Sequence, residues 1–359
     1  MSVLREHAEI EFQEELDLLQ KADKENRPTN WNLSPKAVVN YIMGCKLPNG
    51  AVISPKYVGD KRLIEIAVAT LTTDRALLLY GIPGTGKSWV SEHLTAAITG
   101  NSRLLIQGTS GTGEEAIRYG WNYAKLLTDG PSPAALVETP LMFAMKDGKI
   151  ARIEELTRIS SDVQDNLITI LSEKLLPIPE LNTEVQAIEG FNVIATANNK
   201  DKGVNELSSA LKRRFNTVVL PTPKTSEEEI TIVKTRVEKM MKNAKLQAET
   251  PTLQEIKRIV TIFRELREGI TEDGKQKVKS PTSTMSTAEA IAVVNSGVAL
   301  SAHFGDGKLS SFDIASGLVG AVVKDPVHDK EVWNDYLETI IKPREGWRDL
   351  YRSCKEITI

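Results

Sequence analysis

The sequence predicts an α/β fold, in which a mostly parallel sheet carries helices on both faces and a smaller all-helical domain follows. Between residues 75 and 220, short apolar runs alternate with stretches of helical periodicity, and this alternation is typical of parallel sheets. After Pro221 the chain shows helical periodicity without convincing strands. With 359 residues and 41% apolar content, the chain is long enough for two packed domains and an N-terminal segment.

The N-terminal segment, residues 1–33, begins with a predicted acidic amphipathic helix. Apolar residues recur at helical spacing between residues 3 and 20, and Glu and Asp occupy the other faces. This helix could dock on a neighbouring subunit or partner, or it could lie on the protein's own core, and the sequence leaves both alternatives open. A polar linker follows, and Ser34 and Pro35 then match an N-cap and a first-turn proline. We therefore expect the main domain to begin at residue 34.

The main domain, residues 34–222, is predicted from periodicity to hold five strands, and the helical domain, residues 223–359, to hold at least four helices. The predicted strands are 75–80, 103–107, 149–153, 191–196 and 217–220. The predicted helices between them begin at residue 87 or span 114–127 and 162–175. The helices of the second domain are 226–246, 253–268, 286–304 and 310–324.

A phosphate-binding loop is the most informative motif of the chain. Residues 81–88, GIPGTGKS, match GxxxxGK[ST] and follow the apolar run 76–80, as a strand-loop-helix that binds phosphate requires. Backbone N–H groups of such a loop and the N-terminal end of the next helix converge on the β-phosphate. Lys87 would contact the β- and γ-phosphates, and the Ser88 hydroxyl would ligate Mg²⁺. The motif predicts an ATP site that uses Pro83, Gly84, Thr85, Gly86, Lys87, Ser88 and Trp89.

Hydrolysis of the bound nucleotide needs an acid for the metal, a group that orients water and a positive charge near the γ-phosphate. Glu154 and Glu155 end the predicted strand 149–153, and we assign Glu154 to the water shell of the metal and Glu155 to polarising the attacking water. Asn198 follows the next strand and could hold that water or the γ-phosphate. Arg213 and Arg214 precede the last strand, where either guanidinium could serve as an arginine finger.

Arg152 does not fit its predicted environment. It lies within the strand 149–153, and strands of a parallel sheet are normally buried on both faces. Either this strand is partly exposed, or Arg152 contacts an acidic partner.

Taken together and in order, these blocks resemble the AAA+ ATPases of the MoxR and dynein-related branch, which also contains midasin and the chelatase motor subunits. The resemblance covers residues 52–222 and continues more loosely through the helical remainder. It rests on four blocks: GIPGTGKS, TSGTGEEAIRYGW at 109–121, ETPLMFAMKDGKIARIEELTRISSDVQDNLITILSEK at 138–174, and GFNVIATANNKDKGVNELSSALKRRF at 190–215.

The resemblance implies a role for each matching residue. Lys87 and Ser88 form the Walker A pair, and Glu154 and Glu155 form the Walker B pair. Asn198 is sensor 1, and Arg214 is the arginine finger offered to the next subunit, with Arg213 in reserve. Val58 and Gly59 fall where relatives enclose the adenine. Residues 131–148 resemble the helix-2 insert and residues 176–190 resemble the pre-sensor-1 hairpin, and both project from the ring face or pore in relatives. A finger that acts in trans implies a homo-oligomeric ring, usually a hexamer.

Two departures from the family pattern bear on activity. Relatives place Asp where this chain has Glu154, and the longer side chain could alter the Mg²⁺ geometry and slow turnover. The sensor 2 arginine is missing from residues 283–287, so the lid would sense the γ-phosphate weakly or through another residue such as Lys279. The resemblance implies an ATP-driven ring that remodels or assembles a client protein, typically with a partner that carries a von Willebrand factor A domain. The alternative is a scaffold that binds ATP to assemble but scarcely hydrolyses it.

Composition disfavours other classes. The net charge of −3 gives no basic footprint for nucleic acid, although a ring motor stimulated by DNA or RNA is a third alternative because basic residues cluster between 257 and 279. Cys45 and Cys354 lie far apart and form neither a metal motif nor a disulfide framework. The charged N-terminus and the lack of a long apolar run favour a cytoplasmic protein without a membrane span.

Overall fold

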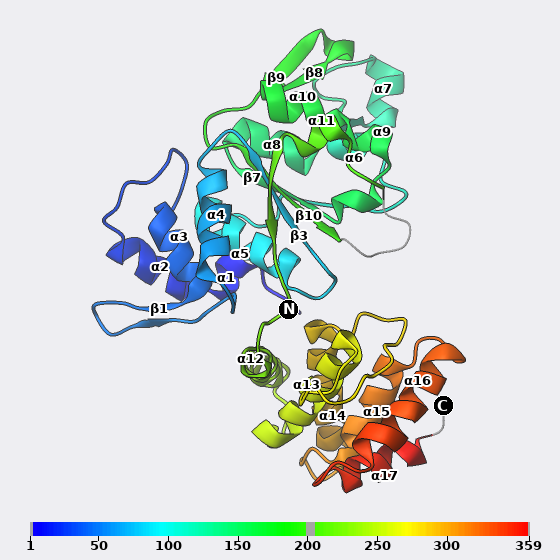
Figure 1. The fold of residues 1–359 in the computed structure, drawn as a ribbon. Coiled ribbons are helices and arrows are strands. Elements are labelled where there is room, and N and C mark those ends of the chain that lie inside the picture. The colour runs from blue at the N-terminus through cyan, green and yellow to red at the C-terminus, as the bar shows by residue number, and fades with distance from the viewer. Residues whose placement is uncertain (1–2, 199–204, 358–359) are drawn as a thin grey trace. The chain divides into compact units, whose positions relative to one another are not determined.

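The computed structural model describes residues 3–198 and 205–357, and its contacts divide the chain into two compact units (Figure 1). The α/β unit comprises Met1–Gly81 and Gly86–Leu220, and the helical unit comprises Ile82–Thr85 and Pro221–Ile359. The contacts therefore change unit after Leu220, two residues before the boundary expected from the sequence.

A five-stranded parallel sheet with the strand order β11-β3-β10-β7-β4 forms the centre of the α/β unit. The mostly parallel sheet predicted from the alternation is therefore confirmed. Its register aligns the carboxyl end of β10 with that of β3, so that Asn198 is paired with Gly81. The strands are β3 (Ala76–Gly81), β4 (Leu105–Gln107), β7 (Ile150–Glu154), β10 (Asn192–Asn198) and β11 (Phe215–Val219).

Helices cover both faces of this sheet, because successive strand residues point to opposite sides. Leu77 and Leu79 join one apolar core, and Ala76 and Leu78 join the other. The first core is completed by α3 (Pro35–Met43), α4 (Lys61–Leu71) and α5 (Lys87–Thr99), and the second by α8 (Pro140–Asp147) and α10 (Asn166–Glu173) (Figure 1). Strands buried on both faces require the near-continuous apolar runs seen in the sequence.

The N-terminal helices α1 (Ala8–Glu11) and α2 (Gln13–Ala22) pack on their own unit. Leu19 is 2% exposed in the first core, and Phe12 contacts Trp89 and His93 of α5 with ring centroids 6.3 Å and 5.0 Å apart. Of the two alternatives left open by the sequence, docking on the protein's own core is the one observed. The predicted cap of α3 is also present, since Ser34 accepts from the Ala37 N–H and Pro35 opens the helix.

Two sequence-based assignments in this unit are wrong. The predicted helix 114–127 is interrupted by strand β5 (Tyr119–Trp121), which pairs with β6 (Leu136–Glu138) and leaves only α6 (Glu114–Ile117) and α7 (Tyr123–Asp129) helical. Residues 131–148 are not a single projecting insert, because Leu141, Met142 and Met145 of α8 are buried in the second core. The segment that does not join the core is instead α7, which has no buried residue and lies between the paired strands β5 and β6.

The remaining elements of the α/β unit are short. The antiparallel pair β8 and β9 coincides with the hairpin expected from the resemblance. These elements are β1 (Cys45–Lys46), β2 (Val52–Ile53), η1 (Leu156–Arg158), α9 (Ser161–Gln164), β8 (Leu175–Ile178), η2 (Pro179–Leu181), β9 (Thr183–Gln186) and α11 (Ser209–Lys212).

In the helical unit, four successive helices begin with a capping box. Each N-cap hydroxyl accepts from the N3 backbone N–H, and the N3 carboxylate accepts from the N-cap backbone in return, which satisfies two otherwise unpaired donors. These helices are α12 (Ser226–Ala244), α13 (Leu253–Glu268), α14 (Thr287–Phe304) and α15 (Ser311–Val322), each within three residues of its predicted limits.

The end of the helical unit holds elements that the sequence analysis left unassigned. Helix α16 (His328–Tyr336) continues into a π-helical turn, η3 (Leu337–Ile341), and α17 (Arg348–Glu356) follows. Trp333 and Tyr336 are buried in the core of the unit. Among the described residues, none of the helices combines the length and apolarity that a membrane crossing requires.

Candidate active site

The phosphate loop connects β3 to α5 through glycines in conformations that other residues rarely adopt. Gly84 and Gly86 have φ angles of 79° and 81°, and Gly86 is the N-cap of α5. The Lys87 ammonium is buried and donates to the carbonyl of Gly81 (3.0 Å). The loop thereby presents its backbone N–H groups and one cation at the start of a helix, as an anion site requires.

Glu154 links this loop to the sheet. Its carboxylate, 3% exposed at the end of β7, accepts from the Ser88 hydroxyl (2.6 Å) and from the Thr196 hydroxyl of β10 (2.6 Å). The Ser91 hydroxyl donates to its other oxygen. Two predicted residues, Ser88 and Glu154, are thus in direct contact. Sequence reasoning missed Ser91 and Thr196, although Ser91 lies one helical turn after Ser88, which places the two on the same face of α5.

Arg152 resolves the question raised by its position in the strand. It is 5% exposed, and its guanidinium donates to Glu154 (2.8 Å), to the Ser91 hydroxyl (3.0 Å) and to the Ser102 carbonyl (3.0 Å). The strand is therefore buried, and Arg152 has an acidic partner, as the second alternative proposed. Burial acts to raise the pKa of Glu154, but the charge of Arg152 and the three hydroxyl donors outweigh it and lower that pKa.

Glu155 has an unusual backbone conformation for a residue with a side chain. Its φ and ψ of 54° and 46° lie in the left-handed region, immediately after β7 ends. Its N–H donates to the Thr196 hydroxyl (3.0 Å), which fixes the turn against β10. The Glu155 carboxylate is about one-third exposed and pairs with Arg158 (3.2 Å). Strain of this kind is concentrated at functional sites, where surrounding contacts hold it.

A glycine permits the turn that carries Glu154 and Glu155. The N–H of Gly108 donates to the carbonyl of Glu154 (2.7 Å), and a Cβ at position 108 would lie 2.5 Å from the carbonyl oxygen of Glu155. Any side chain there would displace the turn that carries both glutamates. The φ angle of Gly108 lies outside the left-handed region that favours glycine, so no turn motif in the sequence marks this requirement.

Asn198 ends β10 at the same edge of the sheet. It is paired in register with Gly81, and Thr196 lies two residues earlier on the same side of the strand. The sheet order therefore places the residue predicted as sensor 1 beside the phosphate loop and one strand from the end of β7.

Arg214 lies at the edge of the sheet that is formed by the amino ends of the strands, opposite the edge that carries the phosphate loop. It immediately precedes β11, whose first residue Phe215 pairs with Ala76 at the amino end of β3, whereas the phosphate loop follows the carboxyl end. Its guanidinium donates to the Ser172 hydroxyl (2.8 Å) and to the Ala210 carbonyl (2.7 Å). The structure does not bring Arg214 to the phosphate loop of its own chain. Arg213, the reserve candidate, is exposed.

The remaining predicted nucleotide contacts stay predictions. Val58 and Gly59 precede α4 and are half-buried. The Trp89 side chain is used for packing, because its indole N–H donates to the Lys56 carbonyl (2.9 Å) and its ring lies 4.2 Å from that of His93. Only the backbone of Trp89 is left to serve the loop. Lys279, the proposed sensor 2 substitute, is exposed.

Comparison with known proteins decides the family. Residues 76–215 match the AAA domain of the dynein-related subfamily, and residues 227–357 match the YehL-like AAA+ ATPase C-terminal domain. The chain is also 37% identical to the uncharacterized protein YehL of Escherichia coli (strain K12), over 97% of this chain and 96% of that protein. The chain belongs to the YehL-like AAA+ ATPases. The resemblance to dynein-related AAA+ proteins is thereby confirmed, and the narrower MoxR assignment stays a prediction.

More distant matches place this YehL-like protein in a wider context. The uncharacterized protein SH1500 of Staphylococcus haemolyticus (strain JCSC1435) is 26% identical over 46% of this chain and 62% of that protein. A crystal structure of NtrX from Brucella abortus in complex with ADP has a TM-score of 0.51 at 12% identity, and the match covers 76% of this chain and 58% of that one. At this identity the likeness shows the fold alone.

Proposed function

We propose that this YehL-like protein is a MoxR-like ring ATPase that couples ATP binding and hydrolysis to the remodelling or assembly of a partner protein. The observation that supports this most directly is that Glu154 accepts hydrogen bonds from Ser88 and from Thr196, which joins the phosphate loop to two strand ends. Asn198 lies at the same sheet edge, in register with Gly81. The residues that we propose as metal ligand, acid and γ-phosphate sensor therefore lie at the edge where parallel sheets bind ligands.

The donors present suit magnesium. Ser88 offers a hydroxyl oxygen at the N-terminal end of α5. The ionised Glu154 accepts a hydrogen bond from this hydroxyl, which leaves a lone pair of the Ser88 oxygen directed away from Glu154. Mg²⁺ prefers such oxygen ligands and, when bound with the phosphates of ATP, neutralises charge on them. Ser88 would hold the ion, and Glu154 would act on its shell through Ser88 or water. Lys87 would exchange the Gly81 carbonyl for the phosphates.

The catalytic roles follow from position. Glu155 is more exposed than Glu154, and among the described residues its carboxylate pairs only with Arg158 of the same turn, so it can rotate toward an attacking water. Asn198 would orient that water or the γ-phosphate. Arg214 lies at the other edge of the sheet, which supports a role at the site of an adjacent subunit and hence a closed ring, for which we propose a hexamer.

A variant series tests this proposal. We expect Lys87→Ala to abolish ATP binding, and Glu155→Gln to retain binding while turnover falls by about 100-fold or more, because general-base catalysis contributes that much. Glu184→Gln, an exposed site on β9, is the matched control and keeps full activity. Equilibrium binding of a fluorescent ATP analogue and release of inorganic phosphate provide the two measurements. Undiminished turnover in Glu155→Gln would remove Glu155 from the mechanism.

The second candidate function is an ATP-dependent assembly scaffold with little hydrolysis. It is favoured by the pairing of Glu154 with Arg152, since a guanidinium beside the metal acid competes electrostatically with a cation. Measured turnover separates the two functions: hydrolysis at rates typical of ATPases, lost in Glu155→Gln, would reject the scaffold. Assembly on ATP without phosphate release would reject the motor.

The partner is proposed from family resemblance. A client protein, or a partner with a von Willebrand factor A domain, would be captured best by the Glu155→Gln variant, which holds the ATP-bound state. Copurification from the native host with Glu155→Gln and with Lys87→Ala as the control would identify it. A nucleic-acid motor has less support, because Arg258, Arg264 and Arg267 of the basic cluster form ion pairs inside the helical unit.

A further inference from the structure

The α/β unit contains a buried lysine that the proposed mechanism does not use. Lys56 lies between β2 and α4, and its side chain is 1% exposed. Lysine is rarely buried to this extent unless its charge is paired. The Lys56 ammonium donates to the Glu15 carboxylate (2.7 Å), to the Ser54 carbonyl (2.6 Å) and to the Ser54 hydroxyl (3.0 Å). An ammonium has three N–H donors, so the protein supplies an acceptor for each of them.

The groups around this ammonium come from the N-terminal helices and from α3. Glu15 belongs to α2, and its carboxylate also accepts from the N–H (3.1 Å) and the hydroxyl (2.7 Å) of Ser54. The ammonium nitrogen lies 4.4 Å from the ring centroid of Phe12, which joins α1 to α2, and 4.6 Å from that of Tyr41 in α3. Both distances are in the range of cation–π contacts. Residues 12–41 therefore enclose a charge that belongs to the segment after β2.

The backbone of Lys56 is bonded to the helix that follows the phosphate loop. Its carbonyl accepts from the indole N–H of Trp89 (2.9 Å), and Trp89 directly follows Ser88, the residue that we propose as the magnesium ligand. The N–H groups of Lys56 and Tyr57 donate to the Ile42 carbonyl near the end of α3 (2.8 and 3.0 Å). Lys56 is thus bonded to α2 through its side chain, to α3 through its N–H and to the first turn of α5 through its carbonyl.

These bonds fix the start of the segment that leads into α4. Tyr57 is 8% exposed, and a Cβ at position 59 would lie 2.8 Å from its hydroxyl oxygen, so the Tyr57 ring lies directly against Gly59. Gly59 has a φ angle of 151°, which side chains disfavour. Val58 and Gly59 are the residues predicted to enclose the adenine. A binding segment that is ordered in advance does not lose that freedom when the ligand binds.

We propose that Lys56 is a positioning residue for the nucleotide base: its ion pair with Glu15 and its bond to Trp89 hold residues 57–59 against the first turn of α5. This inference rests on the proposed function and on the predicted contact of residues 58 and 59 with the adenine. It gives the N-terminal helices a role in nucleotide recognition in addition to their packing on the core. The phosphate loop is shaped by its own glycines and Lys87, so binding of the base and binding of the phosphates depend on different contacts.

The test compares ATP with inorganic tripolyphosphate, which has the phosphates but no base. Both compete with a fluorescent ATP analogue for the full chain, and the affinity of the analogue is measured for each variant. We expect Lys56→Met to weaken ATP binding by about tenfold, because the base segment loses a charge-assisted hydrogen bond that anchors it. Trp89→Phe keeps an aromatic ring and the ion pair but lacks the indole N–H, and should weaken ATP binding by about fivefold. Tripolyphosphate should bind both variants as it binds the unmodified chain.

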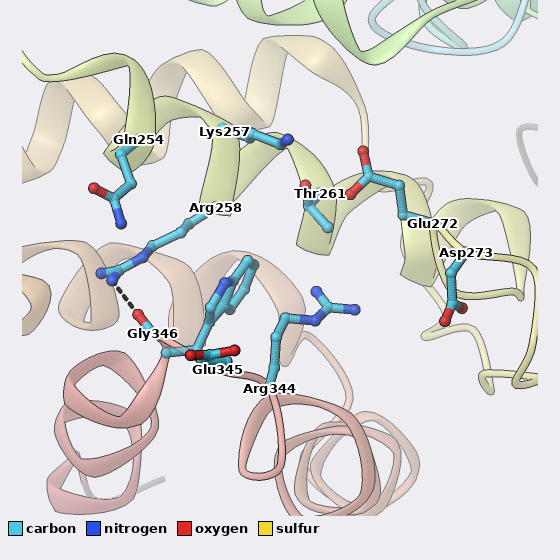
Figure 2. A pocket seen from close by; sticks show the side chains of 10 residues that line it. Gln254, Lys257, Arg258, Thr261, Glu272, Asp273, Arg344, Glu345 and Gly346 are labelled. Atoms are coloured by element: carbon cyan, nitrogen blue, oxygen red, sulfur yellow. Dashed lines mark hydrogen bonds between the residues drawn. The ribbon is translucent and has the colours of Figure 1, made fainter.

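Lys257→Met is the matched control, because Lys257 is exposed on α13 and borders a cavity of the helical unit (Figure 2). It should bind both probes as the unmodified chain does. Unchanged ATP affinity in Lys56→Met and Trp89→Phe, or an equal loss for both probes, would overturn the positioning role and leave the ATP site in place. Tripolyphosphate that competes as well as ATP for the unmodified chain would also overturn it. An unmodified chain that binds no ATP would overturn the proposed function and this inference together.

Discussion

At the scale of single residues, the pair formed by Arg152 and Glu154 distinguishes this site. Both side chains lie on one face of β7 and are about 95% buried. Moving a charge out of water is costly, and a buried pair is retained only when geometry and further hydrogen bonds compensate. Here three hydroxyls complete the environment of the carboxylate, and two backbone carbonyls and Ser91 complete that of the guanidinium.

Replacing one member of this pair should therefore be worse than replacing both. We expect Arg152→Met to lower the free energy of unfolding by about 3–5 kcal/mol, because it leaves a buried carboxylate without its counter-charge. The double variant Arg152→Met with Glu154→Gln should cost less than the sum of the two single changes. Denaturant unfolding followed by fluorescence measures all four proteins. Strictly additive costs would show that the two charges are not energetically coupled.

The residues of the site could be predicted to different extents. Lys87, Ser88 and Glu154 could be proposed because a local motif or a strand end marks each one, and the observed contact of Ser88 with Glu154 follows from parallel strands that end at one edge. Ser91 and Thr196 were missed because their roles depend on three segments meeting in space. Serine and threonine are common in helices and strands, so the sequence alone does not indicate that these two side chains contact Glu154.

At the scale of elements, the N-terminal helices are part of the α/β core rather than a separate arm. We expect Leu19→Ala to lower the free energy of unfolding by about 2–4 kcal/mol, since Leu19 is 2% exposed and truncation leaves a cavity. Leu4→Ala is the matched control, because Leu4 is fully exposed and its loss should change stability by less than about 0.5 kcal/mol. Thermal melting of both variants distinguishes them. Equal melting temperatures would indicate that α2 does not contribute to the core.

Elements differed in how well the sequence predicted them. Helices α12 to α15 were found because capping residues and helical periodicity agree at each start. The β5-β6 pair was mistaken for helix because pairing between residues 119–121 and 136–138 overrides a local helical pattern. Helix α8 was assigned to a projecting insert on resemblance alone, whereas its buried apolar residues decide its place.

At the scale of the whole molecule, the role proposed for Arg214 would make ATP hydrolysis a property of pairs of subunits. Two inactive variants should complement each other when mixed: Arg214→Ala keeps an intact pocket, and Glu155→Gln keeps an intact finger. In randomly mixed rings about one interface in four combines both, so about a quarter of the normal phosphate release is expected. Each variant alone should be inactive. A mixture that stays inactive while the subunits demonstrably co-assemble would place the finger elsewhere.

Acid stability belongs to the same scale, because each unit holds a buried carboxylate with a lowered pKa. In the helical unit, burial acts to raise the pKa of Asp329, but N–H groups of Asp325, Thr282 and Lys324 and the Thr282 hydroxyl outweigh it and lower that pKa. A carboxylate whose pKa is lower in the folded state than in the unfolded state stabilises the fold. This stabilisation is fully present when the pH is above the unfolded pKa, about 3.9 for Asp, and it is lost as the pH falls through the folded pKa.

The difference in melting temperature between the unmodified protein and Asp329→Asn isolates this contribution. We expect the difference to stay constant from about pH 7 to pH 5 and to shrink below about pH 4, where the carboxylate of the unmodified protein takes up a proton. Differential scanning calorimetry across this range provides the measurement. A difference that shrinks already between neutral pH and pH 5 would contradict the assignment.

The guanidinium of Arg152 also gives Glu154, at the end of β7, a counter-ion that belongs to the same strand. Where a metal is the principal positive charge beside such an acid, product release would leave the acid uncompensated until the next nucleotide arrives. In this chain Arg152 balances the charge of Glu154 without a metal, so the end of β7 does not depend on a bound nucleotide for its counter-charge. Purified protein treated with EDTA is therefore expected to melt at the same temperature as untreated protein, and a subunit waiting for ATP is held ready by its own side chain.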